Sequence, residues 1–340
     1  MKALITGIAG FAGSHLAELL LSQGFELSGI SYPGFPLDNL RHLLDKLKIF
    51  QIDITSFKDL ADLIHQVQPH YIFHLAAISS VSASWEGREA AFKTNIMGSF
   101  NLLESCRDLT NSPKVLLVSS GEIYGAALNK KIALRETQAP CPLSPYAAAK
   151  LYSYWMTVNY REGFNIFACN GILFNHESPR RGETFLTRKV TRAIANILAG
   201  KQKVLYLGNL NPGRDWGYAP EYVEAMWKIL QLDGPDDFVI GTGEAHSVRE
   251  FVEQAFSYVD LDFEKHLEID PKYFRPTETE KLIADPRKAK KEIGWEPKIK
   301  FEDLVKIMID ADMRNVGLEP PEEGDDILKK KFPNIWWKGD

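Results

Sequence analysis

A phenol, an ammonium, a hydroxyl and a carboxylate in this sequence could together do chemistry on a sugar alcohol. Tyr146 and Lys150 form a Tyr-x-x-x-Lys pair, and residues four apart lie on one face of a helix. An ammonium beside a phenol favours the phenolate, so we expect Lys150 to lower the Tyr146 pKa and make its oxygen a base. Lys150 could also hydrogen-bond a cofactor ribose. The alternative is an ordinary helix face.

Ser120 and Glu122 follow a predicted strand, Lys114 to Ser119, and strand ends in such sheets face the ligand crevice. Ser120 could bind the sugar hydroxyl that Tyr146 deprotonates, or it could simply cap a turn. A carboxylate here suits proton removal beside a new ketone. Oxidation of a sugar at C4 acidifies the neighbouring C5 hydrogen, and a base can then remove it. The C6 hydroxyl leaves as water, and the stored hydride returns to C6. The alternative for Glu122 is a surface acid.

Three glycines, Gly7, Gly10 and Gly13, lie between the first predicted strand and the first predicted helix. Glycine lets the backbone approach a pyrophosphate, whose charge is favoured by exposed amides and by the helix dipole. This placement predicts a dinucleotide loop, with a ligand-free turn as the alternative. An acid after the second strand would select NAD and an arginine NADP. Ser31, Tyr32 and Pro33 stand there instead, and Arg41 could either fold back or remain solvated.

Short apolar runs alternate with helical patterns up to about residue 172, which predicts an α/β fold with a parallel sheet. The helical stretches show apolar faces at helical spacing, as at Leu60, Leu63, Ile64 and Val67. Later helices are expected at 185–198, 221–230, 288–293 and 301–313, and no structure is assigned to 319–340. The expected strands are Lys2 to Thr6, Glu26 to Ser31, Lys48 to Asp53, Tyr71 to Ala76, Lys114 to Ser119, Asn165 to Gly171 and Asp237 to Gly241.

Composition narrows the function classes. The chain has 340 residues, 45% hydrophobic content and a formal charge of -5, which favour a large core and argue against affinity for nucleic acid or anionic membranes. Cys106, Cys141 and Cys169 lack metal-ligand spacing and are odd in number, so we expect no disulfide framework, no metal and a cytoplasmic location. No apolar stretch is long enough to span a bilayer.

Several long motifs resemble one family. The spacing of Gly7, Gly10 and Gly13 resembles the extended short-chain dehydrogenase/reductase group. The motifs that carry the closer match are 170–182 (NGILFNHESPRRG), 207–210 (LGNL), 214–218 (RDWGY), 222–227 (YVEAMW), 241–252, 273–278 (YFRPTE) and 294–295 (GW). By these motifs the chain resembles the GDP-mannose 4,6-dehydratases over about residues 2 to 313.

The resemblance assigns roles to particular residues. Ser120 stands where the family usually has a catalytic threonine, Glu122 matches its base, Tyr146 its proton-transfer residue and Lys150 a cofactor contact. The remaining implied cofactor contacts are Gly7, Gly10, Phe11, Ala12, Gly13, Asp53, Ile54, Leu75, Ala76, Ala77, His176 and Arg181. The implied nucleotide-sugar contacts are Asn175, Lys189, Arg214, Arg275 and Glu278, whose cations could pair with a diphosphate.

The resemblance also implies the architecture and the reaction. We expect a Rossmann-type doubly wound parallel sheet formed by residues 1–172 and about 212–242, with a smaller interleaved C-terminal α/β substrate domain from about 173–211 and 243–340. The implied reaction converts GDP-mannose to its 4-keto-6-deoxy product. GDP-manno-heptose dehydration, reduction of the 4-keto-6-deoxy sugar, and a non-catalytic nucleotide-sugar sensor are the alternatives.

Three departures concern the cofactor, the serine and the assembly. Phe11-Ala12 replaces the family's Gln-Asp, and Ser120-Gly121-Glu122 replaces Thr-Ser-Glu. Tyr32-Pro33 replaces paired arginines that resemble both an NADP clamp and a tetramer contact. The resemblance implies NADP, but the loss of these arginines argues against it, so NAD is the alternative. The same loss argues against a tetramer, so we expect a homodimer, with a tetramer as the alternative.

Overall fold

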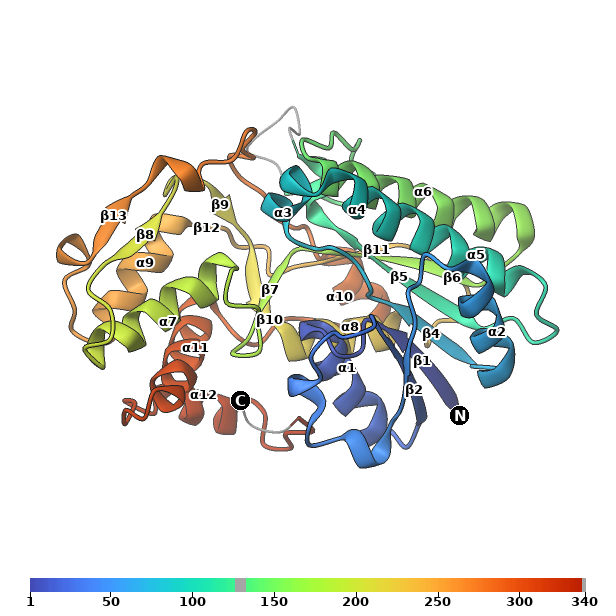
Figure 1. The fold of residues 1–340 in the computed structure, drawn as a ribbon, viewed down its shortest axis with the longest axis horizontal. Helices are drawn as coiled ribbons and strands as arrows, with labels where there is room; N and C mark the ends of the chain where they lie inside the picture. The colour runs from blue at the N-terminus through green and yellow to red at the C-terminus, as the bar shows by residue number, and fades with distance from the viewer. Residues whose placement is uncertain (126–132, 338–340) are drawn as a thin grey trace.

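A parallel sheet with helices on both faces forms the larger part of the molecule (Figure 1). The computed structural model describes residues 1–125 and 133–337. The strand order is β11-β6-β5-β4-β1-β2-β3, and every neighbouring pair is parallel. The strands are β1 (Lys2–Thr6), β2 (Glu26–Ser31), β3 (Lys48–Gln51), β4 (Tyr71–His74), β5 (Lys114–Ser120), β6 (Ala168–Leu173) and β11 (Phe238–Ile240).

Two apolar layers cover the sheet. One contains the buried face of α1 (Phe11–Ser22), with α8 (Ala219–Ile229) and α10 (Arg287–Ile293). The other contains α2 (Phe57–Val67), α5 (Gly98–Arg107) and α6 (Pro145–Phe164). The connection from β4 to α5 runs through α3 (Val81–Glu86), α4 (Arg88–Phe92) and a π-helical turn, Lys93–Met97. Burying Leu60, Leu63, Ile64 and Val67 explains why α2 forms where its apolar spacing predicts it.

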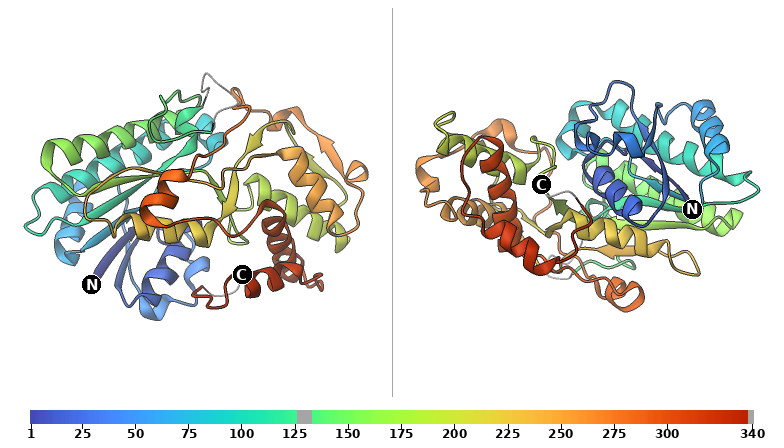
Figure 2. Two further views of the ribbon diagram at one scale, coloured as in Figure 1. Left: turned by 180° about the vertical axis from the view of Figure 1, so that it is seen from behind. Right: turned by 90° about the horizontal axis from the view of Figure 1, so that it is seen from below.

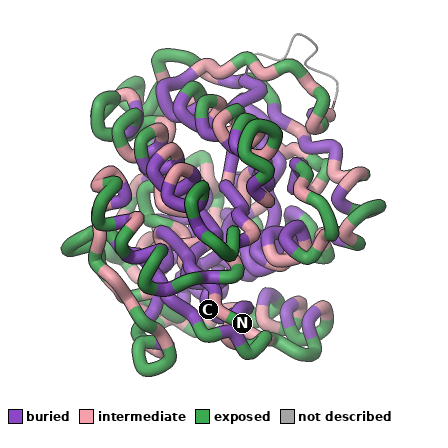
Figure 3. The backbone as a smooth tube through the Cα atoms, turned by 90° about the vertical axis from the view of Figure 1, so that its right-hand side faces the viewer, coloured by how far each residue is buried: buried purple, intermediate pink, exposed green. Residues whose placement is uncertain are grey.

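The remaining elements pack around a second apolar core, and we call this part of the molecule the second lobe (Figure 2). Its helices are α7 (Leu186–Leu198), α9 (Val248–Ser257), α11 (Phe301–Asn315) and α12 (Glu323–Lys331). Its strands pair in twos: β7 (Asn175–Glu177) with β10 (Trp216–Tyr218), β8 (Leu205–Leu207) with β13 (Leu267–Ile269), and β9 (Gly213–Arg214) with β12 (His246–Ser247). Buried segments run through both parts, and exposed segments lie around them (Figure 3).

The fold class predicted from the sequence is confirmed, because a parallel Rossmann-type sheet is joined to a smaller α/β lobe and the chain returns to the sheet at β11. The predicted strand from Asn165 is wrong at its start. Asn165 takes a left-handed conformation that ends α6, and β6 begins only at Ala168. β3 and β4 end two residues earlier than predicted, so Asp53, Leu75 and Ala76 lie in the turns beyond the strands.

The tail contains a helix that the sequence did not predict, α12, which packs on α11 through Leu328. Residues 338–340 of the tail lie outside the described residues. Within the described part of the chain, none of the helices has the length and apolarity that crossing a bilayer requires.

Candidate active site

A cavity of about 730 Å³ opens along the carboxyl ends of the sheet strands and continues into the second lobe. Residues that follow β1, β2, β3, β4, β5 and β6 all line it, as expected for an open α/β sheet. Every site residue predicted from the sequence lines this cavity, from Gly7 at one side to Glu278 at the other. Arg41 is not among its lining residues, and its guanidinium lies 2.5 Å from the Asp38 carboxylate on an exposed surface.

The glycine loop packs too tightly for side chains. Gly7 has φ +72°, and a Cβ there would lie 2.8 Å from the Ala76 nitrogen. A Cβ on Gly13 would lie 2.3 Å from the Gly7 carbonyl oxygen. Gly10 caps α1 with an extended backbone and without a side-chain hydrogen bond, and the first turn of the helix carries no acid. The helix N-terminus is therefore suited to hold an anion.

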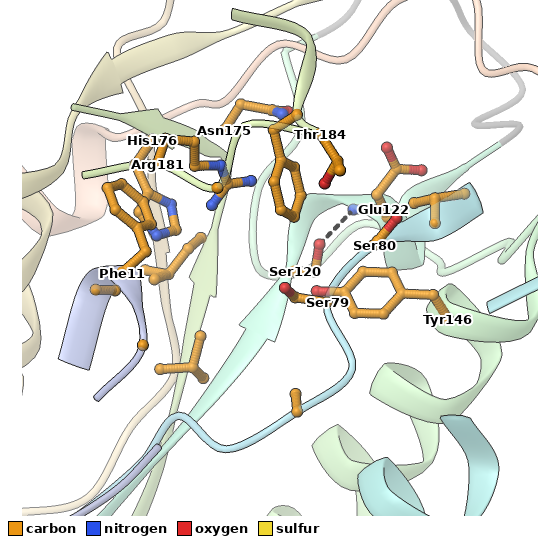
Figure 4. Close-up of a pocket in the computed structure, with 18 of the residues that line it drawn as sticks. Phe11, Ser79, Ser80, Ser120, Glu122, Tyr146, Asn175, His176, Arg181 and Thr184 are labelled. Carbon is orange, nitrogen blue, oxygen red and sulfur yellow. Dashed lines mark hydrogen bonds between the residues drawn. The ribbon is translucent and has the colours of Figure 1, made fainter. Parts of the chain in front are cut away.

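Tyr146, Ser120 and Glu122 converge on one stretch of the cavity (Figure 4). Tyr146 begins α6, whose N-terminus is capped by the Ser144 side chain. The Ser120 hydroxyl accepts a hydrogen bond from the Glu122 amide at 3.2 Å, and it also hydrogen-bonds Tyr146. Gly121 allows this close arrangement, since a Cβ there would lie 3.0 Å from the Phe174 ring.

The expected effect of Lys150 on the Tyr146 pKa is wrong for the polypeptide by itself. Burial raises the Tyr146 pKa to about 12 and outweighs the lowering by the Ser120 hydrogen bond and the Arg181 charge. Burial also lowers the Lys150 pKa to about 8. The Lys150 ammonium donates to the Val118 carbonyl oxygen at 2.8 Å. The helical spacing was right, but sequence could not show the cost of burying both groups.

Aromatic and basic side chains form the side of the cavity next to the glycine loop (Figure 4). Phe11 stacks on His176, with ring centroids 5.6 Å apart, and His176 stacks on Tyr222 at 5.1 Å. The Arg181 guanidinium lies 4.9 Å from the Phe11 ring centroid. Burial lowers the His176 pKa to about 4, so the ring is neutral, and its Nδ1–H donates to the Phe174 carbonyl oxygen at 3.0 Å. Phe11, which departs from the family pattern, thus joins the glycine loop to the second lobe.

The side of the cavity within the second lobe carries the predicted nucleotide-sugar contacts. Arg214 donates to the Glu278 carboxylate at 2.9 Å, and Arg275 lies 3.6 Å from the same oxygen. The Lys189 ammonium lies 3.5 Å from the centroid of the Tyr273 ring, and Asn175 begins β7. These residues come from α7, β7, β9 and the segment before α10, so distant parts of the chain meet here.

A buried network that the sequence did not reveal supports the loop after β4. Thr6 Oγ1 accepts from the Ala76 amide at 3.1 Å and hydrogen-bonds His74 at 2.8 Å. The other ring nitrogen of His74 hydrogen-bonds the Ser99 hydroxyl at 3.2 Å. Burial lowers the His74 pKa to about 3. Asn95 lies in the π-helical turn. Its side chain accepts a hydrogen bond from the Ile78 amide at 2.9 Å and donates one to the Ile78 carbonyl oxygen at 3.1 Å. Such turns often occur at functional sites, but nothing in the sequence pattern indicates one here.

The sequence also did not predict three further residues that line the cavity. Ser79, Ser80 and Thr184 lie near Glu122 and Ser120 (Figure 4). The two serines follow Leu75-Ala76-Ala77 after one intervening residue, Ile78, so the rule that strand ends face the crevice could have found them. Thr184 lies in the connection between β7 and α7, for which no comparable signal exists.

The residues present fit a dinucleotide. The buried hydroxyls of Ser31 and Ser119 line the cavity, and neither forms a hydrogen bond within the described chain. Unsatisfied buried hydroxyls are uncommon, and a ribose or nicotinamide group could satisfy them. Among residues 1–125 and 133–337, no cluster of three His, Cys, Asp or Glu side chains could hold a metal ion.

Known proteins match this chain over most of its length. A family model described as GDP-mannose 4,6 dehydratase matches residues 4–308. GDP-mannose 4,6 dehydratase 2 of Caenorhabditis elegans is 44% identical, over 94% of this chain and 90% of the relative. The human GDP-mannose 4,6 dehydratase is 42% identical over 94% and 93%, and the Vibrio cholerae GDP-mannose 4,6-dehydratase is 42% identical over 98% and 97%.

Solved structures show the same architecture. UDP-glucose 4-epimerase of Thermus thermophilus, in complex with NAD, superimposes with a TM-score of 0.80 at 27% identity, covering 92% of this chain and 99% of that one. dTDP-glucose 4,6-dehydratase of Bacillus anthracis, also with NAD, gives a TM-score of 0.81 over 96% and 99%. Because the second match is only 22% identical, it supports the fold alone. Because the family model and these relatives span most of the sequence, the chain belongs to the GDP-mannose 4,6-dehydratase family.

Proposed function

We propose that this protein is a hydro-lyase that converts GDP-mannose to GDP-4-keto-6-deoxymannose. The observation that carries the proposal is that Glu122, Ser120 and Tyr146 line one cavity, with the Glu122 amide bonded to the Ser120 hydroxyl and the Glu122 charge acting on Tyr146. A sugar oxidoreductase needs only the serine and the tyrosine. A carboxylate next to them provides the base that elimination requires. The curated relatives carry the same name across animals and bacteria, which supports the assignment.

Ser120 and Tyr146 act on the 4-hydroxyl of the sugar. Ser120 holds the hydroxyl oxygen while Tyr146 accepts its proton, and C4 becomes a ketone. The hydrogen bond to Ser120 and the charge of Arg181 both work against the rise in the Tyr146 pKa that burial causes. A bound nicotinamide dinucleotide would supply the hydride acceptor for C4 and the hydride donor for C6. Lys150, one helical turn from Tyr146, is proposed to hold the cofactor ribose.

Glu122 acts once the ketone has formed. The ketone makes the C5 hydrogen acidic, and the carboxylate removes it. The carboxylic acid so formed gives that proton to the departing C6 hydroxyl, which leaves as water. Reduction at C6 and protonation of C5 by solvent would complete the 4-keto-6-deoxy sugar, and Tyr146 would release to solvent the proton taken from the 4-hydroxyl. The sugar loses one water, and no net oxidant or reductant is consumed.

We propose that the chain divides into a dinucleotide-binding domain, residues 1–172 and about 212–242, and a nucleotide-sugar domain, about 173–211 and 243–340. The contacts cross this division, because His176 and Arg181 are proposed cofactor contacts and Arg214 is a proposed nucleotide-sugar contact. Among the cofactor contacts are Asp53, Ile54 and Ala77, which line the cavity after β3 and β4. Asn175, Lys189, Arg214, Arg275 and Glu278 form the nucleotide-sugar side.

We propose NAD rather than NADP, although family resemblance alone favours NADP. The lining at the end of β2 and just beyond it consists of Ser31, Tyr32, Phe35 and Asn39, none of which carries a positive charge. Arg41 is paired with Asp38 and does not line the cavity. A 2'-phosphate would lack a counter-charge there, whereas the unpaired Ser31 hydroxyl suits a ribose hydroxyl. The epimerase with similar structure contains NAD, which agrees. Titration with NADH and NADPH, followed by fluorescence, tests this choice. Tighter binding of NADPH would contradict it.

The alternatives predict different products. A GDP-manno-heptose dehydratase would turn over the heptose faster than mannose. A reductase would consume reduced cofactor in proportion to the 4-keto-6-deoxy sugar. A non-catalytic sensor would bind GDP-sugars without turnover. We also propose that the protein is a cytoplasmic homodimer, with a tetramer as the alternative.

The test is incubation of the purified protein with GDP-mannose and catalytic cofactor, with mass spectrometry of the sugar nucleotide. The proposal predicts loss of one water without net cofactor consumption. Glu122→Gln should bind GDP-mannose normally but lower the elimination rate by about a hundredfold or more, because shape is kept while the base is lost. Tyr146→Phe should prevent the first hydride transfer. Full dehydration by Glu122→Gln would remove the carboxylate from the mechanism.

A further inference from the structure

We infer that Ser84 is a positioning residue for Tyr146, because its hydroxyl fixes the first turn of α6, from which the phenol reaches Ser120. The inference deepens the proposed dehydration and rests on it. It follows from the bond that Ser84 makes, from the segment that carries Ser84, and from the separate way in which the rest of α6 is held.

The Tyr146 amide depends on Ser84 for its hydrogen bond. α6 begins at Pro145, and the amides of a first helical turn have no acceptor within the helix. The Ser144 hydroxyl satisfies the Ala147 amide, at 3.1 Å. The Tyr146 amide donates instead to the Ser84 hydroxyl oxygen at 3.2 Å, in a buried setting. Within the described part of the chain, Ser84 is the acceptor that this amide has.

The position of Ser84 is itself well defined. Ser84 is fully buried in α3, and its hydroxyl donates to the Val81 carbonyl oxygen at 2.6 Å, which leaves its lone pairs for Tyr146. Ser80 caps α3 by accepting a hydrogen bond from the Ala83 amide at 3.2 Å. Ser80 and Val81 both line the cavity. A segment that lines the cavity is therefore bonded directly to the turn that carries the phenol.

The middle of α6 is held by other bonds. The Ser153 hydroxyl donates to the Asn95 carbonyl oxygen at 2.9 Å, and the Asn95 side chain is bonded to Ile78. The Lys150 ammonium donates to the main chain of β5. These bonds lie beyond the first turn of α6. Removing the Ser84 hydroxyl should therefore leave the helix docked and loosen only its N-terminal turn.

A loosened first turn should affect oxidation more than binding. The Tyr146 phenol points to Ser120 and, in the proposed reaction, accepts the proton of the 4-hydroxyl (Figure 4). Misplacing a reacting group by about 1 Å can lower a rate about a hundredfold. Ser84 is not among the described residues that line the cavity, so its removal should change ligand affinity little. A purely structural hydroxyl would instead lower stability without a specific effect on this step.

The experiment compares Ser84→Ala with Thr157→Val, a matched control farther along α6. Thr157 is also fully buried, and its hydroxyl donates to the Ser153 carbonyl oxygen at 2.9 Å. Both changes are made in the Glu122→Gln background, where the proposed reaction stops after oxidation. The rise of reduced-nicotinamide absorbance in a single turnover then reports the step in which Tyr146 acts.

We expect Ser84→Ala to slow this oxidation about tenfold or more, whereas Thr157→Val should stay within about twofold of the parent protein. Calorimetric titration should give Kd values for GDP and NADH within about threefold of the parent protein for both variants. Hydrogen exchange of the protein without ligands adds a readout that does not depend on activity. Residues 143–150 should exchange faster in Ser84→Ala and unchanged in Thr157→Val.

A second comparison shows whether Ser84 acts through the phenol. In the Tyr146→Phe background, adding Ser84→Ala should cause no further fall in the remaining oxidation rate, because no phenol oxygen is left to position. A further fall there, an oxidation rate in Ser84→Ala equal to that of Thr157→Val, or GDP or NADH binding weakened in parallel with the rate would overturn the inference.

Two further outcomes are distinguished by the same measurements. If Ser84→Ala does not fold, Ser84→Cys replaces it, because a thiol of similar size is only a weak acceptor. Failure of the wild type to dehydrate GDP-mannose would refute the proposed function itself. Unchanged exchange of residues 143–150 in the Ser84 variant would refute the positioning bond, whatever the substrate.

Discussion

Burial acts in opposite directions on the two members of the Tyr146 and Lys150 pair. It raises the pKa of the phenol to about 12 and lowers that of the ammonium to about 8, so the polypeptide favours the neutral form of each. We propose that a bound nicotinamide cofactor and a sugar hydroxyl are the groups that this pair meets. The sequence predicted the pair from its spacing, but burial depends on how α6 packs against β5, which no local pattern contains.

Lys150 should leave a signature in the pH dependence of stability. Its pKa falls from an ordinary 10.5 to about 8 in the folded protein. Between these pH values the unfolded chain binds more protons, so the free energy of unfolding rises with pH, and the penalty is fully present below about pH 8. At about 1.4 kcal/mol for each pH unit, the total is about 3 kcal/mol.

Lys150→Met should lack this rise. Urea unfolding of both proteins at about pH 7.5 and about pH 9.5 isolates the contribution of Lys150, since the other groups titrate in both. Wild type should gain stability relative to the variant at the higher pH. An equal pH dependence in the two proteins would show that the ammonium is not desolvated.

At the scale of elements, the amino-acid sequence predicted the strands of the first half of the sheet well. β1 and β2 begin and end where predicted, because short apolar runs there are bounded by glycines and polar residues. β6 was misplaced because Ile166 and Phe167 prolong an apolar run, while Asn165 uses a left-handed conformation to end α6. α12 was missed because it is highly charged and is held mainly through tertiary packing.

Two glycines in helices offer a test of the dinucleotide loop. A Cβ on Gly13 in α1 would lie 2.3 Å from the Gly7 carbonyl oxygen, whereas one on Gly163 in α6 would meet no atom within 4 Å. Gly13→Ala should therefore distort the loop and weaken NADH binding at least about tenfold. Gly163→Ala should leave binding unchanged and stabilise the fold by about 0.5 to 1 kcal/mol.

Fluorescence titration with NADH and urea unfolding provide the two readouts. Normal NADH affinity in Gly13→Ala would mean that the cofactor does not approach the backbone at this turn. The close approach of the glycine loop to Ala76 was within reach of sequence reasoning, since Gly7 and Leu75-Ala76-Ala77 both follow neighbouring strands.

At the scale of the whole molecule, one cavity joins segments that lie far apart in the chain. The end of β5, the turn after it and α6 supply Ser120, Glu122 and Tyr146, and the second lobe supplies Lys189 and Arg275. The family motifs predicted both groups of residues. They did not predict that Arg214 would bridge to Glu122, because that contact requires β9 to lie opposite the end of β5. The residue types were readable from sequence, but their mutual distances were not.

Exposed apolar side chains on adjoining helices suit the proposed homodimer. Trp155 is 50% exposed and Tyr152 is 38% exposed on α6, and Met97 and Phe92 are 43% and 39% exposed on the neighbouring helical segment. Trp155→Glu should convert a dimer to a monomer in sedimentation experiments. Phe57→Glu, at an exposed position on α2, is the matched control and should not. A dimer that persists unchanged in Trp155→Glu would place the interface elsewhere.

The most direct test of the central claim follows one hydrogen through the reaction. If one cavity carries out oxidation, elimination and hydride return on the same sugar, GDP-mannose deuterated at C4 should give a product with deuterium at C6 when the reaction runs in ordinary water. NMR of the product locates the label. Deuterium at C6, with a solvent hydrogen at C5, is the predicted result. A product without deuterium at C6, or label released to solvent or left on the nicotinamide, would contradict the account.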